Sequence, residues 1–518
     1  MTLHNAAGWL VDRHVAEGRA ERTAFRVDGC STSYGDLQRA LWRVQQAMCT
    51  LDVRRGERVA LVLDDELAFP AWFLGALRAG AVPIPLSTML TAQELAAIVD
   101  DAEARTVVVS SSYAGHVDVI AGAAAEVRNA VVIGTPTGGE RVPTFAWSEF
   151  DDCDESPAAA TRADSPAFWL YTSGTTGTPK GAMHRHGSLR ATAETYAASV
   201  LGIGPDDRCL SVAKLFFAYG LGNSLTFPLS VGGTSILNPR RPEPADILAL
   251  ARAEAPTLFF ASPGFVAALL DTDAPDDAFA SVRTTVTAGE ALPADLQRRF
   301  STRFGHPVLD GIGTTEALHI FLSNTDGAER PGSSGQPVAG YDVRIVDADG
   351  LEILDTDEPG RLQVRGPSLT TGYWCRDAAT RAALQGEWLA TGDVYTRSVD
   401  GYWTFLGRNT DMIKAGGIWV SPAEVEAVLV EHPDVLEAAV VGARDGAGLE
   451  VTVAFLVARG GCTIDDGSIE AHCRQRMAAF KRPRRIVVVA ELPKTATGKV
   501  RRFALRDELA AGAAAPAG

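Results

Sequence analysis

Residues 171–181 read YTSGTTGTPKG, and this stretch is the strongest structural signal in the chain. The apolar run 167–170 precedes it, which predicts a buried strand that ends in a loop. Glycines let backbone N–H groups approach a ligand closely, hydroxyl groups donate to phosphate oxygens, and Lys180 adds a positive charge. We therefore predict a loop that binds a polyphosphate. It is not a Walker A motif, because Pro179 stands where the second glycine belongs. A Ser/Thr/Gly-rich surface linker is the alternative, and the preceding strand argues against it.

The composition limits the class of protein. The chain has 518 residues, too many for one hydrophobic core, which predicts a large and a small domain. A net charge of −16 and a pI of about 5.1 argue against a nucleic-acid partner and against an anionic membrane. No stretch is apolar enough to span a bilayer, and residues 1–22 lack a signal pattern and predict an amphipathic helix. Seven cysteines without paired spacing argue against a disulfide framework or a zinc cluster and favour a reducing cytoplasm.

The order of apolar segments predicts an α/β fold. In the first third, non-alternating apolar strands are separated by helices, which is typical of a parallel sheet covered on both faces. The expected strands are 58–63, 82–85, 106–110 and 209–213, and the expected helices are 69–78 and a helix from the Thr91–Glu94 capping box to Asp100.

From Gly332 the pattern becomes all-β and predicts a small barrel or sandwich. We expect a hairpin of 343–346 with 351–354, followed by a strand at 360–364. A small α+β unit ends the chain: a helix capped by Ser421 and Glu424, strands at 438–441, 451–457 and 486–489, a helix at 469–477 and a disordered tail at 510–518.

Further segments follow the phosphate loop in a fixed order. Residues 284–290 read TTVTAGE and residues 310–316 read DGIGTTE, each a strand followed by small residues that can lie flat against a purine. Glu316 offers a hard oxygen donor suited to Mg²⁺. Residues 391–393 read TGD at an expected strand end, where the Asp393 carboxylate can bind both hydroxyls of a ribose. Each segment alone is also typical of an ordinary turn.

In this order, the motifs resemble the acyl-adenylate-forming superfamily of acyl- and aryl-CoA ligases, luciferases and adenylation domains. The resemblance covers about residues 1–510 by motif placement. Residues 5–18 (NAAGWLVDRHVAEG) and 214–237 (KLFFAYGLGNSLTFPLSVGGTSIL) resemble its benzoate–CoA ligase branch. The resemblance implies a ligase that uses ATP, Mg²⁺ and coenzyme A, and that activates a small aryl carboxylic acid as aryl-AMP.

The resemblance also implies roles for single residues. The catalytic residues are expected to be Lys499, Glu316 and Thr172, with Glu316 as the metal ligand. The expected nucleotide- and CoA-binding residues are Ser173, Gly174, Thr175, Thr176, Gly177, Lys180, Ala288, Gly289, Glu290, Asp310, Gly311, Ile312, Thr315, Asp393, Arg408, Gly417, Phe480, Arg482 and Arg484. The expected substrate pocket consists of Phe217, Ala218, Tyr219, Gly313, His319 and Ile320, the first three at a strand end. For His319, a functional role in the pocket and a purely structural role both stay open.

The same resemblance divides the chain into an AMP-binding domain (1–408), a hinge (409–411) and a mobile C-terminal domain (412–518) that carries the catalytic lysine. Many relatives have Tyr in place of Ile312, and Thr410 stands where the hinge residue is usually Asp.

Several alternatives stay open. The acyl acceptor is coenzyme A or the thiol of a carrier protein. A non-catalytic acyl-adenylate binder and a P-loop-type ATPase or kinase are the rivals from other classes; intact Lys499 and Glu316 oppose the first, and the missing Walker spacing opposes the second. The ring substituents, the pathway and the oligomeric state, a homodimer included, are not determined by the sequence.

Overall fold

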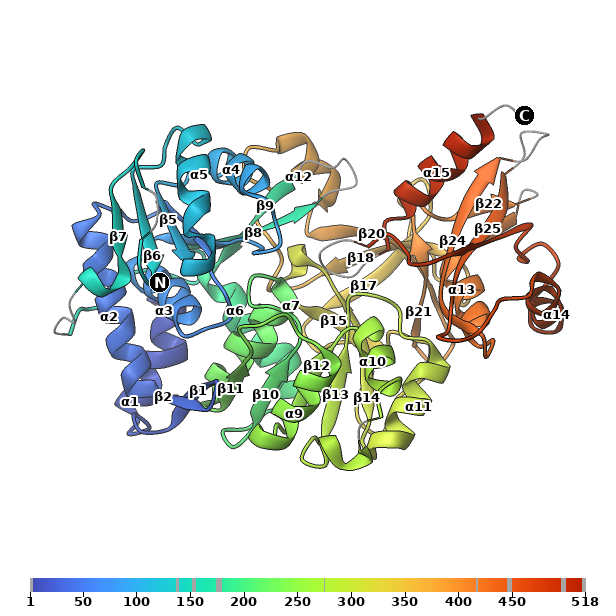
Figure 1. Cartoon of the computed structure of the whole chain (residues 1–518), viewed down its shortest axis with the longest axis horizontal. Helices are drawn as coiled ribbons and strands as arrows, with labels where there is room; N and C mark the ends of the chain where they lie inside the picture. Colours follow the sequence, from blue (N-terminus) through green and yellow to red (C-terminus); the bar gives the residue numbers. More distant parts are fainter. Residues whose placement is uncertain are drawn as a thin grey trace.

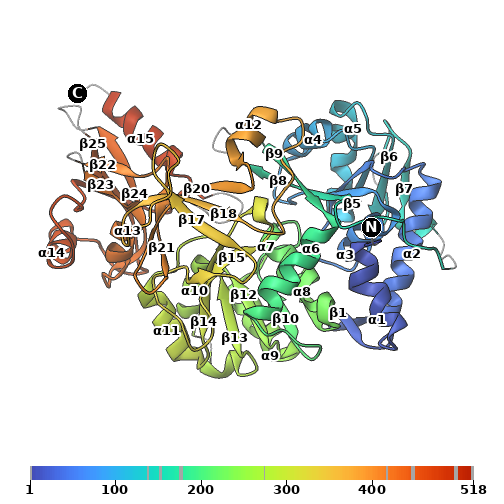
Figure 2. The ribbon, with the colours of Figure 1, turned by 180° about the vertical axis from the view of Figure 1, so that it is seen from behind.

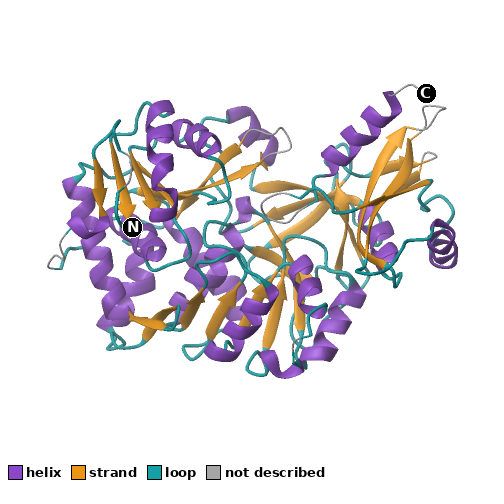
Figure 3. Cartoon of the chain, in the orientation of Figure 1, coloured by secondary structure: helices purple, strands orange, loops and turns teal. Residues whose placement is uncertain are grey.

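The structure is a computed structural model of the chain and describes residues 3–136, 139–150, 155–173, 179–273, 275–415, 418–444, 450–494 and 500–514. Two α/β units form the N-terminal side of the molecule, an antiparallel sheet follows them, and the C-terminal unit lies at the opposite end (Figure 1). Helices flank the strands of both α/β units, as the colours of Figure 3 show. The α/β fold and the separate C-terminal unit agree with the prediction.

The first α/β unit contains a five-stranded sheet in which all neighbours are parallel, in the order β4-β3-β5-β6-β7. Its strands are β3 (Arg58–Val62), β4 (Val82–Pro85), β5 (Thr106–Ser110), β6 (Asn129–Ile133) and β7 (Thr144–Ala146). Its helices are α2 (Tyr34–Thr50), α3 (Ala68–Ala79), α4 (Ala92–Asp101), α5 (Val117–Ala123) and the short η2 (Ser111–His116) and η3 (Trp147–Glu149). Leu61 packs into one hydrophobic cluster and its neighbour Val62 into another, on the two faces of the sheet. Burial on both faces explains why these strands do not alternate in polarity.

The second α/β unit contains a nine-stranded sheet in the order β16-β15-β14-β13-β12-β10-β11-β1-β2. The strands are β1 (Thr23–Val27), β2 (Cys30–Ser33), β10 (Arg208–Ser211), β11 (Thr234–Leu237), β12 (Leu258–Ala261), β13 (Thr284–Thr287), β14 (Val308–Gly313), β15 (Ile320–Ser323) and β16 (Gln336–Pro337). The helical segments are η1 (Gly8–Asp12), α1 (Arg13–Ala16), α6 (His186–Thr192), η4 (Ala193–Ala197), α7 (Ala218–Leu221), η5 (Gly222–Thr226), α8 (Phe227–Val231), α9 (Pro244–Glu254), α10 (Pro263–Leu270), η6 (Asp276–Phe279), α11 (Ala294–Phe304) and η7 (Thr315–Ala317). The centre of the sheet is parallel, and β2, β15 and β16 add antiparallel edges.

An antiparallel ribbon of β8 (Pro166–Ser173) and β9 (Pro179–Arg185) carries the phosphate-loop sequence. In both views it lies beside α12 (Asp377–Ala383), between α4 and the sheet of β17, β18 and β20 (Figure 1 and Figure 2). The loop is shorter than predicted, because Tyr171–Ser173 pair with Pro179–Gly181 as strands. Residues 174–178 lie outside the described residues.

The predicted all-β region is one antiparallel sheet of five strands. They are β17 (Asp342–Val346), β18 (Gly360–Arg365), β19 (Leu384–Gln385), β20 (Trp388–Arg397) and β21 (Trp403–Arg408). The predicted strand 351–354 is reduced to a single bridge from Glu352 to Val346, beside which Ile353 N donates to Ile345 O at 2.9 Å. Ile353 packs against a hydrophobic cluster, whereas Leu351 and Leu354 are 67% and 72% exposed, so the pairing does not extend over the whole segment.

The C-terminal unit is α+β, as predicted. It contains β22 (Ile413–Ala415), β23 (Ile418–Val420), α13 (Pro422–Val430), β24 (Val435–Arg444), β25 (Glu450–Ala458), α14 (Asp466–Arg476), β26 (Arg485–Val489) and α15 (Arg502–Ala514). The predicted cap is confirmed, because Glu424 N donates to Ser421 Oγ at 3.1 Å. The predicted disorder of the tail is wrong for residues 510–514, which continue helix α15, whereas 515–518 lie outside the described residues.

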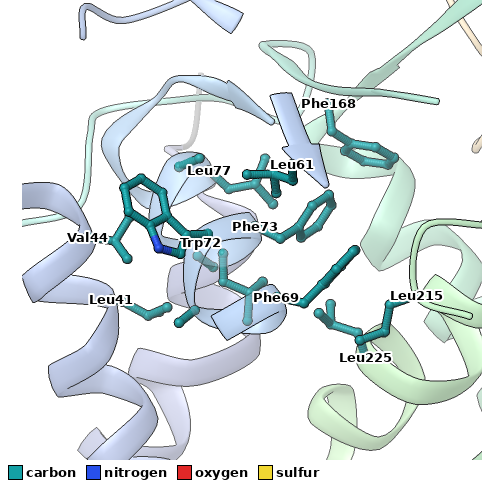
Figure 4. Packing of buried hydrophobic residues seen from close by; sticks show 14 of the residues in the cluster. Leu41, Val44, Leu61, Phe69, Trp72, Phe73, Leu77, Phe168, Leu215 and Leu225 are labelled. Atoms are coloured by element: carbon teal, nitrogen blue, oxygen red, sulfur yellow. The ribbon is translucent and has the colours of Figure 1, made fainter. Parts of the chain in front are cut away.

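The largest hydrophobic cluster joins the two α/β units. Phe69 and Phe73 of α3 pack with Leu215 and Leu225, which come from the turn before α7 and from η5 (Figure 4). Consequently, the segment that carries the expected aryl pocket is anchored on the helix of the neighbouring unit. Among the helices in the described parts of the chain, none is both long and apolar enough to cross a bilayer.

Candidate active site

The ribbon of β8 and β9 is held by a further segment, residues 370–374, which runs alongside β9. Met183 N donates to Gly372 O at 2.9 Å, and Trp374 N donates to Gly181 O at 2.9 Å. Ala182 bridges to Tyr373. These backbone bonds extend the ribbon by one strand-like segment and fix Tyr373 next to Lys180.

Tyr373 connects the phosphate ribbon to the expected metal ligand. Its hydroxyl group donates to Glu316 Oε1 at 2.6 Å, and the Lys180 Nζ lies 5.5 Å from the centroid of its ring. Burial, together with the neighbouring Glu316 carboxylate, raises the pKa of Tyr373, so the phenol stays protonated and keeps donating. Lys180, Tyr373 and Glu316 therefore form one polar cluster, and the Glu316 carboxylate provides an oxygen donor of the kind that Mg²⁺ binds.

The backbone around Glu316 is supported from β9 and contains a strained residue. The ring of His184 is buried against Phe168, and its Nε2 lies 2.9 Å from Thr315 O. Burial lowers the pKa of His184 to about 4, so the neutral ring donates to this carbonyl group. Leu318 has φ of 69°, a left-handed conformation that a leucine rarely adopts. This turn separates Glu316, which contacts Tyr373, from His319, which lies among other aromatic rings.

His319 is enclosed by aromatic rings and carries no charge. It is 3% exposed, and its ring centroid lies 4.5 Å from that of Phe227 and 5.5 Å from that of Tyr219. His319 Nε2 lies 3.1 Å from Asn223 Oδ1. Burial lowers the pKa of His319 to about 3, which makes Nε2 a donor to the amide oxygen. A Cβ atom on Gly222 would lie 2.3 Å from His319 Cδ2, so only glycine leaves space for the ring.

Of the three residues expected at a strand end, Tyr219 contacts this ring, but all three stand at the start of a helix. β10 ends at Ser211, and Phe217 and Ala218 stand at the first turn of α7. The prediction failed because residues 212–217 form a turn between the strand and the helix. Phe217, Ala218 and Tyr219 are partly exposed, and Tyr219 donates its hydroxyl to Val286 O at 3.0 Å. Gly313 and Ile320, also expected in the pocket, pair with each other across β14 and β15.

The expected adenine segments meet at the carboxyl ends of β13 and β14. Thr287 Oγ1 donates to Asp310 Oδ1 at 2.9 Å, and both side chains are buried. Burial raises the pKa of Asp310 to about 8. The same edge carries Ala288, Gly289, Glu290, Gly311 and Ile312. Crevices at the carboxyl ends of parallel strands are common ligand sites, and these residues share that edge.

Asp393 lies within β20 at an irregularity of the strand, not at its end. The ladder between β20 and β21 shifts register between Val394 and Tyr395, and Gly392 has φ of 80°. Asp393 pairs with Arg408 across the ladder, and the Arg408 Nη1 lies 3.1 Å from Asp393 Oδ1. The structure thus joins the two residues expected to contact the ribose.

A cleft of about 340 Å³ extends from Lys180 and Tyr373 to Asn409, the residue after β21. It is lined by Lys180, Val346, Arg361, Leu362, Gln363, Tyr373, Ala379, Ala382, Ala383, Gln385, Ala390, Gly392 and Asn409. Lys180 thus lines the same cavity as Gly392, which precedes Asp393, and as Asn409 of the expected hinge. A larger hollow of about 580 Å³ near Arg43 and Trp147 contains none of the predicted site residues.

Some predicted residues fall outside this geometry. Lys499, Gly417, Gly174, Thr175, Thr176 and Gly177 lie outside the described residues, as does the side chain of Ser173, whereas Thr172 pairs with Lys180 across the ribbon. Phe480, 37% exposed, and Arg484 lie on the C-terminal unit before β26, and the Arg482 Nε donates to Met477 O at 3.1 Å. Arg502, three residues after Lys499, is within electrostatic range of Glu290.

Sequence reasoning missed three residues: Tyr373, His184 and Asn223. Each forms a hydrogen bond with a residue that is distant in the sequence, and neither composition nor motif spacing predicts such a bond. Of the three, Asn223 was the easiest to predict from the sequence, because an amide side chain inside the apolar run 214–237 indicates a buried hydrogen-bond partner.

Comparison with known proteins identifies the family of the chain. The model of the AMP-binding enzyme family matches residues 12–374, and that of the AMP-binding enzyme C-terminal domain matches residues 424–499. The chain is 42% identical over 509 residues to a benzoate–CoA ligase of Thauera aromatica, covering 97% of this chain and 96% of the relative.

Two solved structures are similar to it over nearly their whole length. A benzoate CoA ligase from Burkholderia xenovorans LB400 has a TM-score of 0.90 and 41% identity, covering 97% of this chain and 100% of that one. An anthranilate CoA ligase, AuaEII, in complex with anthranoyl-AMP has a TM-score of 0.95 and 36% identity, covering 99% of both chains. This chain therefore belongs to the AMP-binding enzyme family, in the benzoate–CoA ligase branch of the adenylate-forming ligases.

Proposed function

We propose that this protein is an AMP-forming acid–thiol ligase that converts benzoate or a small substituted benzoate, ATP and coenzyme A into the aryl-CoA thioester, AMP and pyrophosphate. One observation carries the proposal: within residues 315–319, a carboxylate accepts from Tyr373, whose ring contacts Lys180, and a neutral histidine lies among aromatic rings. A phosphate-handling cluster and an apolar pocket that suits a flat ring therefore lie one turn apart. The names of the relatives support the same substrates.

In the first step, a carboxylate oxygen of the aryl acid attacks the α-phosphorus of ATP. The new bond joins that oxygen to phosphorus, the bond to the β-phosphate oxygen breaks, and pyrophosphate leaves. No general base is needed, because the attacking group is already an anion. We assign the stabilisation of the developing charge to Lys180, Lys499 and the backbone of residues 172–178, with Thr315 at the α-phosphate.

Glu316 fits a role as ligand of Mg²⁺. Its partly buried carboxylate is oriented by the Tyr373 hydroxyl, whose ring also contacts Lys180, and a polyphosphate bound there would supply further oxygen ligands. When bound, Mg²⁺ would neutralise phosphate charge during the transfer. Asp393 and Arg408 are proposed to hold the ribose, with adenine on the segments 288–290 and 310–312.

In the second step, the thiolate of the acceptor attacks the carbonyl carbon of aryl-AMP, and AMP leaves as the carbon–oxygen bond breaks. We propose that residues 412–518 rotate about the hinge 409–411 relative to residues 1–408 between the steps. The rotation would withdraw Lys499 and bring Gly417 to the site. Phe480, Arg482 and Arg484 are proposed to bind the nucleotide part of coenzyme A.

The proposal is tested by ATP–pyrophosphate exchange with a panel of benzoates and medium-chain fatty acids, followed by a thiol-acceptor assay with coenzyme A. We expect benzoate or a small substituted benzoate to give the fastest exchange, and coenzyme A to consume the adenylate. Faster exchange with fatty acids than with every aryl acid would contradict the aryl pocket. Adenylate formation without transfer to coenzyme A would favour a carrier-protein thiol as the acceptor.

A further inference from the structure

A buried ion pair outside the predicted site connects the two α/β units. Asp65 lies between β3 and α3 and is 4% exposed, and Lys214 lies between β10 and α7. The Lys214 Nζ is 4.0 Å from Asp65 Oδ2, and Leu215 N donates to Asp65 Oδ1 at 3.1 Å. The carboxylate therefore holds both the side chain and the backbone of the turn that precedes the pocket.

The Lys214 ammonium group also holds the end of a neighbouring strand. Its Nζ donates to Asn238 O at 2.6 Å and to Arg240 O at 2.7 Å, directly after β11. One ammonium group thus joins the loop after β3, the turn after β10 and the chain after β11. Burial raises the pKa of Asp65 to about 6 and lowers the pKa of Lys214, with Asp64 and Arg240 as the other charged groups that face the pair. Burying such a pair costs desolvation energy, so it contributes less to stability than to geometry.

The turn at Lys214 is packed directly against the pocket helix. Phe217 N donates to Lys214 O at 3.0 Å, and Leu221 N donates to Phe217 O at 2.8 Å. A Cβ atom on Gly220 would lie 2.0 Å from Lys214 O, which shows how closely α7 sits on the turn. Leu215 packs beside Phe69 (Figure 4). A shift of the Lys214 backbone would therefore move Phe217 and the start of α7 with it.

We propose that Asp65 and Lys214 are positioning residues for the aryl-acid pocket, and that they set which ring substituents the pocket accepts by fixing the turn 213–217 from which Phe217, Ala218 and Tyr219 project. This inference rests on the proposed function, because it concerns the selectivity of the same pocket. Neither side chain is placed among the groups that contact ATP or the reacting carboxylate.

The test compares Asp65→Asn, Lys214→Met and the double variant in the exchange assay, with separate KM values for benzoate, a para-substituted benzoate and ATP. Lys214→Met leaves a buried carboxylate without its cation, and we expect it to raise the KM for benzoate about tenfold. The preference between the two acids should change by about fivefold or more, while the KM for ATP changes less than about twofold. Asp65→Asn keeps an acceptor for Leu215 N, so its effects should be smaller.

The double variant removes both charges and should restore much of the benzoate KM that Lys214→Met loses. Asp64→Asn is the matched control, because it neutralises the neighbouring carboxylate, which accepts from the Tyr113 hydroxyl at 3.1 Å. It should resemble wild type in all three KM values.

Three results would overturn the inference: unchanged acid selectivity in Lys214→Met, a KM for ATP that rises as much as that for benzoate, or equal effects of Asp64→Asn. If Lys214→Met does not fold, Asp65→Asn decides the question, because its smaller change in acid selectivity must still exceed that of Asp64→Asn. If the wild-type protein shows no ATP–pyrophosphate exchange with any aryl acid, the proposed function itself is contradicted. The wild-type assay gives that result before any variant is compared.

Discussion

Replacing Tyr373 with phenylalanine tests whether Lys180, Tyr373 and Glu316 act together in binding ATP and Mg²⁺. The substitution removes one oxygen and leaves the ring, so the contact of the ring with the Lys180 ammonium is retained. It removes only the 2.6 Å hydrogen bond to the Glu316 carboxylate. Hydrogen bonds to a charged group contribute about 1.5–3 kcal/mol, which corresponds to about 10- to 150-fold in an equilibrium constant. Because both side chains are partly exposed, we expect the lower end of that range.

The predicted effect is specific for Mg²⁺. Without the phenol, the Glu316 carboxylate loses its fixed orientation, so Mg²⁺-dependent binding of ATP should weaken about tenfold, and exchange should need more Mg²⁺ for half-maximal rate. Calorimetric titration of ATP, with Mg²⁺ and with a chelator, measures the first effect without any turnover.

Tyr171→Phe is the matched control for this variant. It removes a hydroxyl group of the same ribbon that donates at 2.7 Å to a different carboxylate, that of Asp101. Its Mg²⁺ dependence should be that of wild type. The reasoning is refuted if Tyr373→Phe binds ATP equally well in the presence of Mg²⁺, or if both variants lose the same affinity.

Four further changes have defined outcomes. Gly222→Ala places a Cβ atom 2.3 Å from His319 Cδ2 and should raise the KM for benzoate, with an overpacking cost of about 1–3 kcal/mol; an unchanged KM would remove His319 from the pocket. Lys499→Ala should lower adenylation by orders of magnitude but spare thioester formation from supplied aryl-AMP, and equal losses in both half-reactions would indicate a structural role. Because burial raises the pKa of Asp310 to about 8, its stabilising contribution is lost as the pH rises from about 4 towards 8, so Asp310→Asn should reduce the fall in melting temperature over that range. Thr410→Pro should still form aryl-AMP but transfer it slowly in single-turnover experiments, and a wild-type transfer rate would place the hinge elsewhere.

Many helices and strands of the fold could be predicted from residues that are close together in the sequence. The non-alternating runs at 58–63 and 106–110 predicted strands of a parallel sheet, and the structure buries them on both faces. The Thr91 cap is a local contact as well, and Glu94 N donates to Thr91 Oγ1 at 3.3 Å. Signals of this kind succeed because they depend on residues within one turn of each other. The same logic was only partly successful at 351–354, where Ile353 packs against a hydrophobic cluster but Leu351 and Leu354 are exposed and only Glu352 forms a bridge.

The fold class, the family and the order of the expected nucleotide-binding segments could be predicted, because contiguous motifs carry them. Which side chains meet could be learned only from the folded chain. Tyr373 reaches Glu316 across 57 residues, His319 reaches Asn223 across 96, and Leu215 reaches Asp65 across 150. Contacts over such separations arise from the packing of whole sheets and helices against each other, and no local propensity or spacing encodes them.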